Sequence, residues 1–109
     1  MSYKIVIIGG GSVLWTPRLC CDMFMEPALD GSELVLVDID AAAARLCKSY
    51  LERCLEVLKK SWRISIVDED SALKNASSVV VSISTGGFEA MDKDYTIPEK
   101  YGVFHTVGV

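Results

Sequence analysis

The sequence predicts an α/β fold: a Rossmann-type parallel sheet with helices on both faces, truncated after about four strands. Three observations support this prediction. Short β-branched runs alternate with helical segments, a glycine-rich loop directly follows the first run, and an aspartate ends the second. Such alternation produces parallel strands, because each right-handed crossover must return over the sheet. We therefore expect one domain over residues 1–109.

Four segments have the pattern of strands. Lys4–Ile8 is a β-branched run followed by three glycines, which is typical of a strand buried on both faces. Glu33–Val37, Arg63–Val67 and Ser78–Ser84 are similar runs. As a last strand, Ser78–Ser84 would leave an apolar edge unpaired, which indicates that the chain is part of a longer protein.

Helices are expected between these strands. Thr16 is a suitable capping residue, and Pro17 suits the first helical position of a helix that runs to Met25. Asp40 can cap a second helix over residues 41–60, where apolar positions recur every three or four residues.

Two further helical segments are predicted toward the end of the chain. Ser71–Asn75 is expected to form a short helix. Ala90–Lys93 is a second helical stretch, which Ile97 and Pro98 are expected to interrupt.

Composition excludes several classes of partner. The chain carries 11 basic and 15 acidic residues, a net charge of −4, and no cluster of Lys or Arg, so nucleic acid is not expected. No apolar run approaches the roughly 20 residues of a membrane span, and no signal peptide is visible, so we expect a cytoplasmic protein without a membrane partner. The four cysteines form no CxxC pair and are expected to be reduced core thiols.

The loop after the first run predicts a dinucleotide site made by Gly9, Gly10, Gly11, Ser12 and Val13. Gly9 permits a tight turn, and Gly11 lets the backbone approach a pyrophosphate, whose charge the loop N–H groups and the following helix would bind. The GxGxxG fingerprint is incomplete, since the position of its third glycine is occupied by Leu14 in this chain.

Asp38 favours NAD as the cofactor. It ends the second run, where its carboxylate can accept hydrogen bonds from both adenosine ribose hydroxyls and would repel the 2′-phosphate of NADP. The alternative is that Asp38 and Asp40 are turn and cap residues. Thr85 and Gly86 end the fourth run at the same sheet edge and are expected near the nicotinamide ribose, unless they form a plain glycine turn.

The segments IVIIGGGSVLWTPRL, LVLVDID, STGGFEAM and DYTIPEKYG resemble the N-terminal part of glycoside hydrolase family 4. The resemblance implies an NAD-dependent glycosidase in which NAD oxidises the sugar C3 hydroxyl, elimination and water addition follow, and the hydride returns. It also implies a divalent metal, usually manganese, in the full-length enzyme only. The family's metal-binding Cys and His have no counterpart here, so we expect residues 1–109 to bind NAD without catalytic or metal residues and to be inactive alone.

The resemblance also bears on the substrate. The phospho-sugar members have an arginine that holds the substrate phosphate, and the aligned position here is Met91, whose thioether cannot pair with a phosphate. We therefore expect a non-phosphorylated α-glycoside, such as an α-galacturonide or α-galactoside, and a homo-oligomeric enzyme. The alternatives are a fragment of a 2-hydroxy acid dehydrogenase, a non-catalytic nucleotide- or S-adenosylmethionine-binding module, and a fragment that folds without measurable affinity for a ligand.

Overall fold

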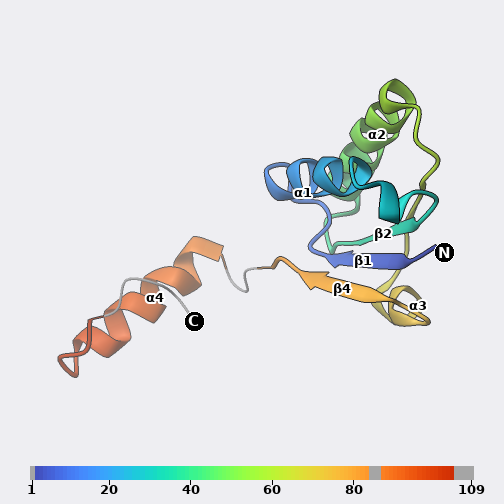
Figure 1. Ribbon diagram of the computed structural model, residues 1–109. Coiled ribbons are helices and arrows are strands. Elements are labelled where there is room, and N and C mark those ends of the chain that lie inside the picture. The colour runs from blue at the N-terminus through green and yellow to red at the C-terminus, as the bar shows by residue number, and fades with distance from the viewer. Residues whose placement is uncertain (1, 84–86, 105–109) are drawn as a thin grey trace.

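A single parallel sheet organises the part of the chain that the computed structural model describes, residues 2–83 and 87–104. Its strands are β1 (Lys4–Ile8), β2 (Glu33–Val37), β3 (Arg63–Ile66) and β4 (Ser78–Val81). They are all parallel and lie in the order β3-β2-β1-β4, as Figure 1 shows for β1, β2 and β4. This order matches the first four strands of the Rossmann order 3-2-1-4-5-6, and it confirms the predicted fold class.

Helices cover both faces of this sheet. The helices are α1 (Trp15–Phe24), α2 (Ala41–Leu58), α3 (Glu69–Leu73) and α4 (Gly87–Glu99), with a short 3-10 helix, η1, at Pro27–Leu29. In Figure 1, α1 and α2 lie together on one side of the sheet and α3 lies on the other. The right-handed crossovers expected from the alternating sequence therefore lead to a three-layer arrangement.

The central strands are buried on both faces. Ile5, Ile7, Leu34 and Leu36 pack toward α1 and α2, where Phe24 and Trp62 meet edge to face with ring centroids 5.0 Å apart. On the opposite face, a smaller cluster consists of Val6, Val35 and Ala72. Because successive side chains of a strand point to opposite faces, the unbroken apolar runs of β1 and β2 supply both layers at once.

The beginning of α1 differs from the prediction. Thr16 is not the capping residue: it lies in the first turn, and its buried Oγ1 has no hydrogen-bond partner among the described residues. Ser12 has the capping contacts instead, because its Oγ accepts from Trp15 N–H at 3.3 Å and its carbonyl accepts from Thr16 N–H at 3.0 Å. The helix therefore begins at Trp15, before the predicted cap, and Pro17 lies within its first turn, where a missing N–H is tolerated.

The other boundaries shift by one to three residues. The predicted helix over residues 41–60 ends at Leu58, since Lys59 adopts a left-handed conformation with φ +55°. The helix predicted at Ser71 begins at Glu69, because the Asp68 side chain caps it by accepting from Ser71 N–H at 3.2 Å. The strands predicted to reach Val67 and Ser84 end at Ile66 and Val81.

The helix α4 is longer than predicted and passes through Pro98 instead of ending before it. Pro98 lies in the last turn, where its fixed φ is compatible with the helix and only the hydrogen bond to the Asp94 carbonyl is lost, and Gly102 then closes the helix end with φ +74°. Val103 N–H donates to the Pro98 carbonyl at 3.0 Å and Gly102 N–H to Glu99 at 3.0 Å, which is a Schellman motif.

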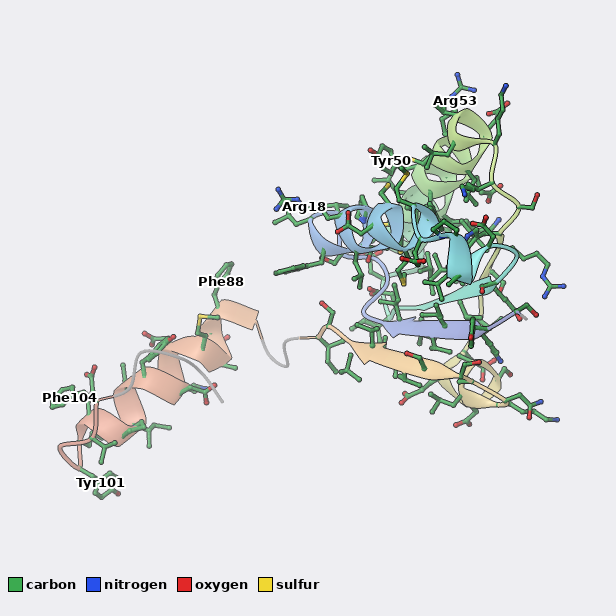
Figure 2. All side chains as sticks on the ribbon, in the orientation of Figure 1. Arg18, Tyr50, Arg53, Phe88, Tyr101 and Phe104 are labelled. Carbon is green, nitrogen blue, oxygen red and sulfur yellow. The ribbon has the colours of Figure 1, made fainter. Side chains whose placement is uncertain are left out.

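The helix α4 projects away from the sheet. None of its described residues is buried, and the longest dimension of the chain, 54 Å, is twice the other two. Figure 2 shows Phe88, Tyr101 and Phe104 pointing outward from this segment without a neighbouring layer. The edge strand β4 likewise exposes Val79 and Val81. This apolar surface is typical of a region that another part of a protein covers.

The cysteines are free thiols on α1 and α2. Cys20 and Cys47 are buried, and Cys21 and Cys54 are half-buried. Burial raises the pKa of Cys20 to about 12 and that of Cys21 to about 11, so both are protonated at neutral pH. The prediction of core thiols therefore holds fully for Cys20 and Cys47, which face the cluster beneath α1 and α2.

Candidate functional site

A cleft of about 550 Å³ opens at the carboxyl ends of the strands. Its described lining comes from the ends of β1, β2 and β4 and from the beginnings of α2 and α3: Ile8, Gly9, Gly11, Ser12, Val37, Asp38, Ile39, Asp40, Ala43, Glu69, Ser82 and Ile83. Ligands of open α/β sheets bind at this edge, where the strand order reverses beside the first strand. The structure thus brings Gly9, Gly11, Ser12 and Asp38 together, whereas the predicted contacts Gly10 and Val13 are not part of the described lining.

Gly9 turns the chain sharply at the end of β1. Its φ of +93° is a conformation that L side chains rarely adopt, and a Cβ there would overlap the Ser82 carbonyl oxygen of the chain leaving β4. Ser82 N–H also donates to the Ile8 carbonyl at 2.8 Å, so this neighbour is tied to β1. Glycine is therefore required at position 9 for two independent reasons.

The next two glycines let the loop lie against β2. A Cβ on Gly10 would come within 2.9 Å of the Leu36 Cβ, and a Cβ on Gly11 would come within 2.7 Å of Asp38 Oδ2. Gly9 and Gly10 N–H both donate to the Val37 carbonyl, at 2.8 and 3.0 Å. Because these glycines have no Cβ, the loop can lie in close contact with the end of β2.

Asp38 fastens this contact. Its Oδ2 accepts from Gly11 N–H at 2.8 Å, and its Oδ1 accepts from Asp40 N–H at 2.8 Å. A carboxylate has about four acceptor positions, so about two remain free, one on each oxygen. Asp40 has the predicted capping role, since its Oδ1 accepts from Ala43 N–H at 3.1 Å.

The donors left for a ligand lie just after the glycines. The N–H groups of Gly9, Gly10, Gly11 and Ser12 all donate within the protein, Ser12 to the Gly9 carbonyl at 3.2 Å. Within the described residues, the N–H groups of Val13 and Leu14 have no acceptor. Such open donors at the beginning of a helix attract anions.

Sequence reasoning did not name several residues of the cleft, among them Ile39 and Glu69. Ile39 directly follows Asp38, and its side chain is fully exposed. Glu69 follows β3, whose carboxyl end lies at the same sheet edge, and that position is the signal that could have identified it. Thr85 and Gly86 lie outside the described residues, while Ser82 and Ile83, shortly before them, line the cleft.

The sequence pattern of one family, described as Family 4 glycosyl hydrolase, matches residues 4–109. This chain belongs to glycosyl hydrolase family 4. The family 4 chain is 40% identical over 106 residues to an alpha-galacturonidase from Thermoanaerobacter italicus and 36% identical over 108 residues to an alpha-galactosidase from Rhizobium meliloti. The two alignments cover 96% and 98% of this chain.

A solved structure has the same fold as this family 4 chain. It is the 6-phospho-beta glucosidase from Thermotoga maritima with NAD and glucose-6-phosphate, with a TM-score of 0.72 and 27% identity over 95% of this chain. Another structure of that glucosidase also contains manganese. This chain covers 22% of the two curated relatives and 25% of the glucosidase, so it spans about a quarter of their length.

Proposed function

We propose that this chain is the NAD-binding part of a family 4 glycosidase that hydrolyses a non-phosphorylated α-glycoside. The observation that carries the proposal is the cleft where Asp38 keeps about two acceptor positions and where the glycine loop and Ser12 lead directly into the open N–H groups of Val13 and Leu14. Acceptors for ribose hydroxyls beside donors for a pyrophosphate match the adenosine half of NAD. The cofactor bound in the Thermotoga maritima relative supports the same choice.

The residues present fit NAD. The free positions on Asp38 equal in number the two adenosine ribose hydroxyls, whereas the anionic 2′-phosphate of NADP would be repelled by the carboxylate. Gly9, Gly10 and Gly11 keep the loop close to β2 and so hold Ser12 at the cleft, and Val13 follows directly in the chain. We retain Thr85 and Gly86 as predicted contacts of the nicotinamide ribose. NAD, when bound, supplies the hydride chemistry at the sugar ring.

The remaining chemistry is assigned to the longer enzyme. Among residues 2–83 and 87–104, no cluster of three His, Cys, Asp or Glu side chains could hold a metal ion. We propose that a divalent metal, manganese by analogy with the Thermotoga maritima relative, acts in the full-length enzyme and that this chain alone is inactive on glycosides. Homo-oligomerisation and a cytoplasmic location are also proposals; no described helix has the length and apolarity needed to cross a membrane.

A calorimetric titration of this chain tests the cofactor. We expect saturable binding of one NAD per chain, with NADP at least about 10-fold weaker because Asp38 repels its 2′-phosphate. Because the chain belongs to family 4, we no longer consider it a fragment of a 2-hydroxy acid dehydrogenase. Binding of S-adenosylmethionine with no binding of NAD would contradict the proposal and support a different nucleotide-binding module.

The substrate class depends on Met91, which lies half-exposed on α4. The relatives described above include an alpha-galacturonidase and an alpha-galactosidase, which agree with an apolar residue where a phosphate-binding arginine would stand. We expect the full-length enzyme with NAD and manganese to hydrolyse p-nitrophenyl α-galacturonide or α-galactoside. This turnover is expected with Met91 in place, without an arginine at that position. Hydrolysis of a 6-phospho-glycoside but neither plain glycoside would overturn the assignment.

A further inference from the structure

The cleft contains a third carboxylate, Glu69, to which the site described so far gives no role. Glu69 is the first residue of α3 and lines the same cleft as Asp38 and Asp40. Its side chain is exposed. The question is therefore what ligand group this carboxylate meets.

Each of the neighbouring carboxylates already accepts hydrogen bonds from the protein. Asp38 accepts from Gly11 and Asp40 N–H, and Asp40 accepts from Ala43 N–H. Asp68 caps α3, and hydrogen bonds from the Ser71 hydroxyl and N–H lower its pKa. Glu69 has no hydrogen bond or ion pair with any described residue, so its acceptors are all available to a ligand.

The strand order decides which part of a ligand reaches Glu69. Along the carboxyl edge, the open N–H groups of Val13 and Leu14 follow β1, Asp38 follows β2 and Glu69 follows β3, and these strands are consecutive neighbours. In NAD, the pyrophosphate, the ribose and the adenine are joined in that same order. With the pyrophosphate at β1 and the ribose at β2, the adenine extends toward β3, about one strand spacing of 4.8 Å further on.

We propose, on the basis of the NAD site above, that Glu69 selects the adenine base by accepting a hydrogen bond from its 6-amino group. An ionised carboxylate only accepts hydrogen bonds, and the 6-amino group is the exocyclic donor of adenine. The exposed Ile39 side chain, from the loop between β2 and α2, supplies an apolar surface for the flat ring in the same cleft. Glu69 is thus a specificity-determining residue for the base, distinct from the ribose contact of Asp38.

The test compares NAD with its 1,N6-etheno analogue, in which the 6-amino hydrogens are replaced by a fused ring. The proposal predicts that the unmodified chain binds NAD about 10-fold more tightly than the analogue, the size of one charged hydrogen bond. In Glu69→Ala, NAD affinity falls by about 10-fold while analogue affinity changes little, so the preference disappears. Asp70→Ala is the matched control, because Asp70 is also an acidic residue of the first turn of α3 but does not line the cleft.

Each outcome decides a separate point. Loss of the preference in Glu69→Ala with retention in Asp70→Ala supports the inference. If NAD binds equally well to Glu69→Ala, or if the analogue stays equally disfavoured in that variant, Glu69 does not contact the 6-amino group and the inference is wrong. No binding of NAD to the unmodified chain overturns the proposed function itself. Circular dichroism checks that both variants fold.

Discussion

Replacing Asp38 by alanine is expected to weaken NAD binding by about 100-fold or more. The carboxylate keeps about two free acceptor positions, and two hydrogen bonds to a charged group are worth about 1.5–3 kcal/mol each. Their loss is at least about 3 kcal/mol, which corresponds to about 100-fold in affinity. The variant also leaves the Gly11 N–H without its acceptor and loosens the loop that holds Val13. Calorimetric titration of both chains with NAD measures the effect.

Asp40→Asn is the matched control for Asp38. Asp40 lines the same cleft, and the substitution removes one negative charge while an asparagine oxygen can still accept from Ala43 N–H and cap α2. We expect its NAD affinity to change by less than about 3-fold, in the range of a single exposed charge. An Asp38→Ala variant that binds NAD as tightly as Asp40→Asn would show that Asp38 is a turn residue and not a ribose contact.

Replacing Gly9 by alanine is expected to destabilise the fold severely. A left-handed backbone costs an L residue about 1–2 kcal/mol, and overpacking adds about 1–3 kcal/mol. The overlap at Gly9 is with the Ser82 carbonyl, which is backbone tied to β1 and cannot rotate away. A total of about 2–5 kcal/mol should lower Tm by about 10 °C or more in a domain of this size. Thermal unfolding followed by circular dichroism measures it.

Gly31 separates the two causes. Its φ is +80°, close to that of Gly9, but a Cβ there would meet nothing within 4 Å. Gly31→Ala should therefore cost only the conformational part, about 1–2 kcal/mol. Equal Tm losses for the two variants would mean that the close contact between the glycine loop and the chain after β4 does not contribute.

The elements that were predicted well are those set by local pattern. The segments that form β1 and β2 are apolar without alternation, which is typical of strands buried between two layers. Their predicted bounds match the structure. Asp38 was found because the carboxyl ends of parallel strands share one edge, so a residue 29 positions after Gly9 is its neighbour in space. The Asp40 cap is likewise local.

The features that were not predicted depend on contacts between distant segments or on competing local signals. Thr16 followed by Pro17 looks like a helix start, yet Ser12 caps because its oxygen reaches Trp15 N–H. The internal use of the glycine N–H groups depends on the Val37 carbonyl, which belongs to another strand. Pro98 did not end α4, because its fixed φ is compatible with a helix, and the end is set by Gly102 beyond it.

The most direct test of the NAD site is an amide-resolved NMR titration of this chain with NAD. The account predicts that the largest shifts fall on the Val13 and Leu14 N–H signals, whose donors are open, with smaller shifts at Gly11 and Asp40, whose donors are held by Asp38. Saturating NAD that leaves the Val13 and Leu14 signals unchanged, or that shifts signals only away from the cleft, would contradict it.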